Sequence, residues 1–95
     1  MAPKILFIED ELNLLEALTF ILQNEGFQVA GTPRRIEGVR LAKESPPDLV
    51  LLDLNLPDID GFEVCRRLKA DPSTRSSLIL MLSARGGMDD IVSGL

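Results

Sequence analysis

The sequence is poor in several features, and each shortage excludes a class of protein. Its 95 residues contain a single cysteine, so no internal disulfide can form, which is typical of a reducing compartment. A net charge of −5 argues against direct nucleic-acid binding, because phosphates require a basic surface. The first ten residues hold an apolar run of only four, too short for a signal peptide or membrane span. We therefore expect a cytoplasmic protein with no membrane contact.

The composition that remains is that of one globular domain over residues 1–95. Hydrophobic residues make up 45% of the chain and charged residues 26%, and no low-complexity tract or glycine-rich nucleotide motif occurs. Unbroken apolar runs at residues 5–8, 49–52 and 78–82 predict strands covered on both faces, and residues 27–30 predict a fourth strand. Helical segments between the strands favour a parallel α/β sheet with right-handed crossovers.

Four helices are predicted between and after these strands. The first spans residues 12–25 with Gly26 as a left-handed cap, and the second follows Thr32, an expected N-cap, and Pro33. The third ends near Asp71, and the fourth begins at Met88. Helical spacing predicts three apolar faces: Leu14, Leu15, Leu18, Ile21 and Leu22; Ile36, Val39 and Ala42; and Phe62, Cys65 and Leu68.

Two groups of residues receive an ordinary structural interpretation. Cys65 falls on an apolar helix face, so we interpret it as a small buried hydrophobe and not as a reactive thiol. The pairs Arg34-Arg35 and Arg66-Arg67 are interpreted as solvated helix faces.

Polar side chains follow three of the predicted strands. Glu9 and Asp10 follow the first, Asp53 ends the third and Ser83 follows the last. Because the carboxyl ends of parallel strands meet at one edge of the sheet, these groups are expected to converge, where crowded carboxylates favour a cation such as Mg²⁺. A hydroxyl and backbone N–H groups nearby would suit phosphoryl oxygens. This convergence favours phosphoryl chemistry at Asp53 over a simple strand-capping acid.

Three segments carry a resemblance to a known family. They read KILFIEDE, DLVLLDLNLPDIDGFEVCRRLK and LILMLSAR, in this order and at this spacing. Together they resemble the receiver domains of two-component response regulators, over residues 4–95. The resemblance implies a flavodoxin-like, doubly wound parallel sheet with strand order 2-1-3-4. It also implies a phosphoacceptor signalling domain, not a conventional enzyme, that assists its own phosphorylation and dephosphorylation.

The resemblance assigns the metal and the phosphoacceptor. It implies that Asp53 accepts a phosphoryl group from a phosphohistidine on a sensor histidine kinase. Asp10 would bind Mg²⁺ directly, Glu9 through water and Asn55 through its backbone carbonyl, with Asp53 completing the protein ligands. Mn²⁺ would be an acceptable substitute. Glu9 stands where an aspartate is commoner in the family, a change that should retain metal binding.

The resemblance also assigns two residues after the last strand. Ser83 would hydrogen-bond the phosphoryl group and move inward on phosphorylation, and Ala84 would donate its backbone N–H. The segment SARGGMDDIVSGL further resembles regulators with a winged-helix DNA-binding output domain, which implies a parent protein in transcription control.

One departure from the family concerns the C-terminal end. Receiver domains continue into a fifth strand that ends in a lysine and then a fifth helix, so this domain is predicted to be truncated before both. Lys4, Lys43 and Lys69 are expected to lie away from the active edge. An apolar sheet face would be partly bared and an edge strand exposed, and both features favour association. The chain is therefore expected to be either a fragment of a longer regulator or a shortened protein that needs a partner, for example through a homodimer or a domain swap.

Two other functions remain open at this stage. A pseudo-receiver that only binds proteins would retain the metal ligands but lack the lysine. A Mg²⁺-dependent phosphohydrolase of the haloacid-dehalogenase type also uses an aspartate after a strand, but that family resembles Asp-x-Asp, whereas Leu54 and Asn55 follow Asp53 here.

Overall fold

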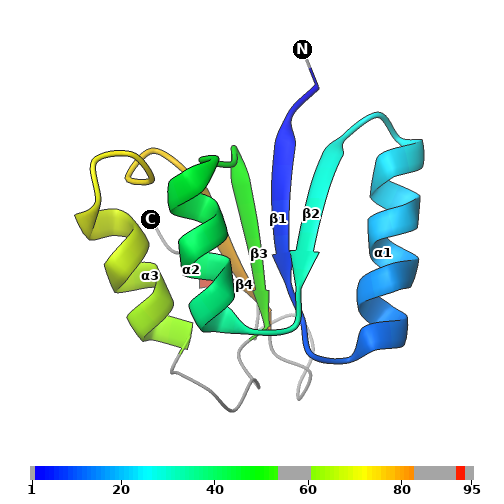
Figure 1. Cartoon of the computed structure of the whole chain (residues 1–95), viewed down its shortest axis with the longest axis horizontal. Helices are drawn as coiled ribbons and strands as arrows, with labels where there is room; N and C mark the ends of the chain where they lie inside the picture. The colour runs from blue at the N-terminus through cyan, green and yellow to red at the C-terminus, as the bar shows by residue number, and fades with distance from the viewer. Residues whose placement is uncertain (1, 54–60, 83–91, 94–95) are drawn as a thin grey trace.

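Strands and helices alternate along the chain as the apolar runs predict (Figure 1). The computed structural model describes residues 2–53, 61–82 and 92–93. Its elements are β1 (Lys4–Ile8), α1 (Leu12–Asn24), β2 (Gln28–Thr32), α2 (Arg35–Glu44), β3 (Leu49–Asp53), α3 (Gly61–Ala70), β4 (Leu78–Leu82) and β5 (Val92–Ser93). The sheet order is β2-β1-β3-β4-β5, and the first four strands are parallel. The predicted order 2-1-3-4 is therefore confirmed.

The predicted helix beginning at Met88 is wrong at the two of its residues that the structure describes. Val92 and Ser93 form β5, which runs antiparallel to β4 opposite Met81 and Leu80. A sheet edge offers unpaired N–H and C=O groups, and a β-branched valine suits a strand. Pairing with that edge has outweighed the helical tendency of the local sequence.

The boundary between β2 and α2 also differs from the prediction. Gly31 does not end the strand, because β2 continues to Thr32 in register with Ile8 of β1. Thr32 is not the N-cap; α2 begins at Arg35. The Thr32 hydroxyl instead accepts from the backbone N–H of Arg34 at 3.3 Å and donates to Glu37 Oε1 at 2.9 Å. It fixes the turn from outside the helix.

The buried faces of α2 and α3 are rotated from the predicted ones. On α2 the buried residues are Arg35, Gly38, Val39 and Ala42, and on α3 they are Gly61, Val64 and Leu68. The first set follows the i, i+3, i+4, i+7 spacing of one helix face, and the second follows i, i+3, i+7 of the same pattern. Ile36 and Phe62, predicted to be buried, are 55% and 58% exposed because each lies one position beyond that face.

The two faces of the sheet are covered unequally (Figure 1). Helices α2 and α3 pack on one face, and of the described helices only α1 packs on the other, against β1 and β2. On α1 the predicted stripe is only half realised, since Leu15, Leu18 and Leu22 are half-buried while Leu14 and Ile21 are exposed. Gly26, with φ of 98°, follows the helix in the left-handed conformation, as predicted.

The main core fills the space between the sheet and the α2–α3 layer. It is a single cluster of apolar side chains contributed by β1, β3, β4, α2 and α3: Leu6, Ile8, Val39, Ala42, Val50, Leu52, Val64, Leu68, Ile79 and Met81. The cluster reaches the last residue of β1 and the penultimate residue of β3, so the carboxyl ends of both strands rest on a rigid base. Within the described ranges, no helix is long and apolar enough to cross a membrane.

Candidate functional site

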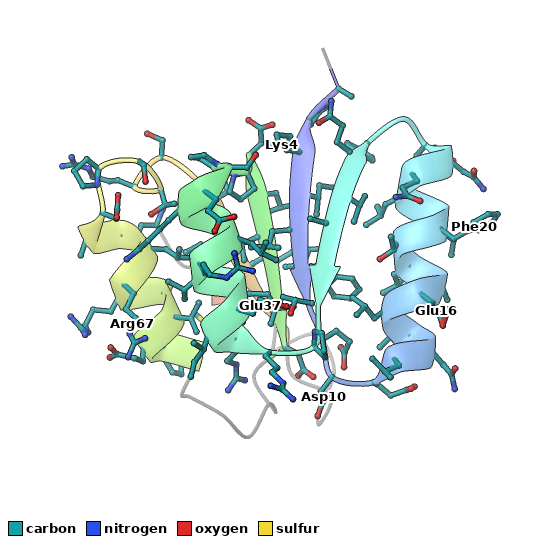
Figure 2. The ribbon with its side chains drawn as sticks, in the orientation of Figure 1. Lys4, Asp10, Glu16, Phe20, Glu37 and Arg67 are labelled. Atoms are coloured by element: carbon teal, nitrogen blue, oxygen red, sulfur yellow. The ribbon has the colours of Figure 1, made fainter. Side chains whose placement is uncertain are left out.

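Three carboxylates converge at the carboxyl edge of the sheet. Glu9, Asp10 and Asp53 each bring one carboxylate oxygen to within 4.8 Å of the others. The pairing of β1 with β3, in which Ile8 lies opposite Leu52, sets Glu9 beside Asp53. Both are nearly buried, at 7% and 6% exposed, whereas Asp10 is exposed at the edge of the molecule, near the start of α2 (Figure 2).

The turn between β1 and α1 holds Glu9 in place. Its backbone N–H donates to the carbonyl of Thr32 at 3.0 Å, which extends the β1–β2 ladder by one bond. Its carboxylate accepts from the backbone N–H of Glu11 at 3.1 Å, and Glu11 in turn caps α1 by accepting from the N–H of Asn13. Strand, turn and helix cap therefore fix this carboxylate together.

Crowding and burial change the acidity of Glu9. The pKa of Glu9 is raised from 4.5 to about 7, mainly by burial and also by the neighbouring Asp53 and Asp10, while the backbone N–H of Glu11 opposes the shift. A carboxyl group with such a pKa holds a proton near neutral pH because its charged form is poorly solvated and repelled. A cation at the same place would relieve both effects.

The donor set fits a hard divalent cation. Three carboxylate oxygens that share a partly buried edge are the ligands that Mg²⁺ prefers, and the exposed position of Asp10 leaves room for waters. The described residues thus fit the predicted metal site at Glu9, Asp10 and Asp53. Asn55, Ser83 and Ala84 lie outside the described residues, so their predicted roles stay predictions.

Arg35 is a residue of this site that the sequence interpretation missed. It was interpreted as solvated, but its side chain is 1% exposed. Its Nε donates to the backbone carbonyl oxygen of Asp53 at 3.1 Å, and its Nη2 donates to the same oxygen. The signal was present: Arg35, Gly38, Val39 and Ala42 occupy one helix face, and an arginine among small apolar residues on such a face is not solvated.

The other basic residues named in the sequence interpretation lie as predicted. Arg34, Arg66 and Arg67 are exposed, and the last two pair with Glu63 on α3, whose pKa they lower to about 2.

Cys65 is half-buried against the core, and burial raises the pKa of its thiol, as expected for an unreactive cysteine.

The lysines lie away from the carboxylates. Lys4 begins β1, at the amino edge of the sheet. Lys43 pairs with Asp71 at 3.7 Å, and Lys69 donates to the carbonyl of Ser77 just before β4. None of them lies at the carboxyl edge, as predicted.

Comparisons with known proteins identify the family and support the fold. The family model for the response regulator receiver domain matches residues 5–95. The chain is 43% identical over 95 residues to the phosphate regulon transcriptional regulatory protein PhoB of Rhizobium meliloti, covering 100% of this chain and 42% of the relative. It is 41% identical over 95 residues to the DNA-binding response regulator MtrA of Mycobacterium tuberculosis, covering 100% and 40%.

A solved structure extends the likeness to three dimensions. The receiver domain of a sensor histidine kinase from Pseudomonas aeruginosa, with a magnesium ion coordinated in its active-site cleft, matches with a TM-score of 0.83 and 28% identity, covering 95% of this chain and 74% of that one. The chain spans about two fifths of the length of the curated relatives it matches. It belongs to the family of response regulator receiver domains of two-component signal transduction.

Proposed function

We propose that this receiver domain accepts a phosphoryl group on Asp53 from a phosphohistidine of a sensor histidine kinase, in a reaction that requires Mg²⁺. The observation that carries the proposal is the convergence of Glu9, Asp10 and Asp53 to within 4.8 Å at the carboxyl edge of the sheet. A structural acid at a strand end would not require two more acids beside it, at the cost of a pKa of about 7 for Glu9.

The chemistry proposed for Asp53 is a direct transfer. One carboxylate oxygen forms a bond to phosphorus while the P–N bond of the phosphohistidine breaks, and the imidazole leaves with the electron pair of that bond. A carboxylate is a weak nucleophile, but transfer of this kind depends mainly on position and on neutralised charge. The last position of a buried, paired strand provides the position.

Glu9 and Asp10 would hold the cation, together with Asp53. When bound, Mg²⁺ would offset the carboxylate charge and the charge of the incoming phosphoryl oxygens. Without that compensation the three acids would repel the phosphoryl donor. We therefore expect an absolute need for a divalent ion, with Mn²⁺ as a substitute.

The remaining roles rest on the family resemblance and on position in the chain. Asn55 follows Asp53 by two residues and would offer its backbone carbonyl to the metal. Ser83 directly follows β4 and would hydrogen-bond the phosphoryl group, with Ala84 donating its N–H. The proposed Ser83 movement would convert phosphorylation into a signal.

The test is phosphorylation by acetyl phosphate with Mg²⁺, measured by intact mass. Wild type should gain one phosphate, and Asp53→Asn, which keeps the size of the side chain but not its nucleophilic charge, should gain none. EDTA should abolish the adduct, and Mn²⁺ should restore it. An adduct that persists in EDTA, or that forms equally on Asp53→Asn, would contradict the proposed mechanism.

Two other outcomes would indicate the alternative functions. No adduct on a folded wild type, shown to be folded by circular dichroism, would indicate a pseudo-receiver that binds proteins. Steady release of phosphate from phosphate esters would indicate a phosphohydrolase. The residue two positions after Asp53 is Asn55 and not a second acid, and this argues against the hydrolase.

We further infer that the phosphorylated state controls a transcriptional output in the cytoplasm, through other parts of a longer protein. The support is that two relatives, PhoB and MtrA, are named as transcriptional or DNA-binding regulators and are more than twice as long as the matched region. Incompleteness of the domain at its C-terminal end, and a homodimer or domain swap through an exposed edge, stay predictions.

A further inference from the structure

The largest fully buried side chain among the described residues is charged. Arg35 is 1% exposed, and two of its guanidinium nitrogens donate to one atom, the backbone carbonyl oxygen of Asp53. Burying a guanidinium is costly unless it is hydrogen-bonded, and an apolar residue of similar size would fill the same space without that cost. The position of this arginine therefore calls for an explanation beyond packing.

The approach of α2 to β1 brings Arg35 to this position. A Cβ atom at Gly38 would lie 2.3 Å from Ile8 Cδ1 and 2.8 Å from Cγ1, so only glycine allows this spacing without a shift of the neighbour. Arg35 lies one turn before Gly38, at the end of α2 that is level with the carboxyl ends of the strands (Figure 1). From there its side chain spans to the end of β3.

We propose that Arg35 is a positioning residue for the phosphoacceptor: by holding the carbonyl of Asp53 it fixes the backbone from which the Asp53 carboxylate projects. The inference rests on the proposed function of Asp53. Both hydrogen bonds converge on one oxygen, so a rotation of the Asp53 peptide group would weaken both together. The carbonyl and the carboxylate branch from the same Cα atom, and the peptide held here is also the first of the segment that leads to Asn55.

The distinction between positioning and packing sets the design of the test. Arg35→Met keeps a long apolar stem but removes both donors, and Arg35→Lys keeps the charge and one donor group but not the two-nitrogen fork. Arg34→Met is the matched control, because it removes the same charge from the neighbouring, exposed position. For each variant, the carbon-13 shift of the Asp53 carbonyl reports the hydrogen bonds, and the phosphorylation rate with acetyl phosphate at saturating Mg²⁺ reports function.

We expect Arg35→Met to shift the Asp53 carbonyl resonance and to slow phosphorylation about tenfold or more, since small misplacements of reacting groups carry penalties of this order. Arg35→Lys should fall between Arg35→Met and wild type, and Arg34→Met should match wild type within about twofold, because an exposed charge is well screened. A folded Arg35→Met with the wild-type rate would overturn the inference. If Arg35→Met does not fold, Arg35→Lys decides: a shifted carbonyl with the wild-type rate overturns the inference, and a shifted carbonyl with a slower rate supports it.

Failure of the proposed function would look different. In that case wild type itself would take no phosphate, whatever residue stands at position 35. The Mg²⁺ affinity of the same variants, measured by calorimetry, then replaces the rate. A weaker affinity in Arg35→Met than in Arg34→Met would support positioning by Arg35, and equal affinities would overturn it.

Discussion

The two faces of the sheet differ in how well similar apolar residues are covered. Facing α2 and α3, the residues of β1, β3 and β4 join one cluster that is at most 7% exposed. On the face that α1 covers, exposure rises from β1 to β4 along one row of paired residues: Ile5 on β1 is 5% exposed, Leu49 on β3 is half-buried and Leu78 on β4 is 50% exposed. The partly bared sheet face predicted from the sequence is therefore present in the part of the chain that the structure describes.

The comparison shows that apolar character and burial are separate properties. Strands alternate their side chains between two faces, so the continuous apolar runs supply both faces with large apolar side chains. The stabilisation depends on the layer that covers each face. In the part of the chain that the structure describes, α2 and α3 cover one face, and α1 covers the β1–β2 half of the other.

The largest effect is expected from Leu68→Ala in α3. Leu68 is fully buried in the cluster, so removing its side chain should leave a cavity and cost about 3–5 kcal/mol in free energy of unfolding. Urea unfolding followed by circular dichroism measures it, because the chain has no tryptophan. A loss below about 1 kcal/mol would mean that the α2–α3 layer is not packed as described.

Gly38→Ala tests the close contact between that layer and the sheet. Alanine favours a helix over glycine by about 1 kcal/mol, but its Cβ would meet the Ile8 side chain at 2.3 Å, so we expect a net loss of about 1–3 kcal/mol. Ile8→Val removes the Cδ1 atom that is struck first. The loss in free energy of unfolding of the double variant should therefore be smaller than the sum of the losses of the two single variants. Additive losses would show that the two residues do not touch.

Glu9→Gln tests the carboxyl edge, where both faces of the sheet end. Folded Glu9 keeps its proton up to a pKa of about 7, whereas the unfolded chain releases it near 4.5, so wild-type stability should fall as the pH rises between these values. Glutamine cannot ionise, and the variant should be about 1–3 kcal/mol more stable than wild type at pH 7.5 without metal, and similar at pH 4.

Bound Mg²⁺ should make wild type more stable than Glu9→Gln at pH 7.5, the reverse of the order expected without metal. The cation competes with the proton, so it should raise the unfolding midpoint of wild type more at pH 7.5 than at pH 5, and less in Glu9→Gln. Equal stability of the two proteins at every pH, with or without Mg²⁺, would show that burial and the neighbouring acids do not raise the pKa of Glu9.

Leu14→Ala in α1 is the matched partner of Leu68→Ala and should have the smallest effect. The chemical change and the helical setting are the same, but Leu14 is 42% exposed. We expect a loss below about 1 kcal/mol in the same urea experiment, because part of the side chain is never removed from water. A loss in free energy of unfolding close to that of Leu68→Ala would show that the two faces of the sheet do not differ in how well their apolar side chains are covered.

The three acids of the site were predicted from a short pattern in the sequence. An apolar run that ends in an acid marks both a buried strand and its carboxyl end, and parallel strands align those ends, so Glu9, Asp10 and Asp53 were expected together and are found together. Arg35 was missed because an arginine pair at the start of a helix is usually solvated, and the rotation of the helix about its axis decides which member of the pair is buried.

The same limit applies to Ile36, Phe62 and Val92. Their apolar character suggested buried helix faces or a continuing helix, but contacts with distant elements decided otherwise. Periodicity shows that a helix has a face; it does not show how far the helix is turned before it packs. That angle depends on close contacts such as that of Gly38 with Ile8, which join residues far apart in the chain.

The sequence by itself determined the first four strands, the three helices between them and the convergence of three acids, because apolar period and strand ends are local signals. The order of the strands in the sheet was implied by the family resemblance. The tertiary structure alone decided that Arg35 holds the carbonyl of Asp53 and that the pKa of Glu9 is raised to about 7. Each of these depends on distances between residues remote in sequence, and burial, hydrogen bonding and charge repulsion act only across such distances.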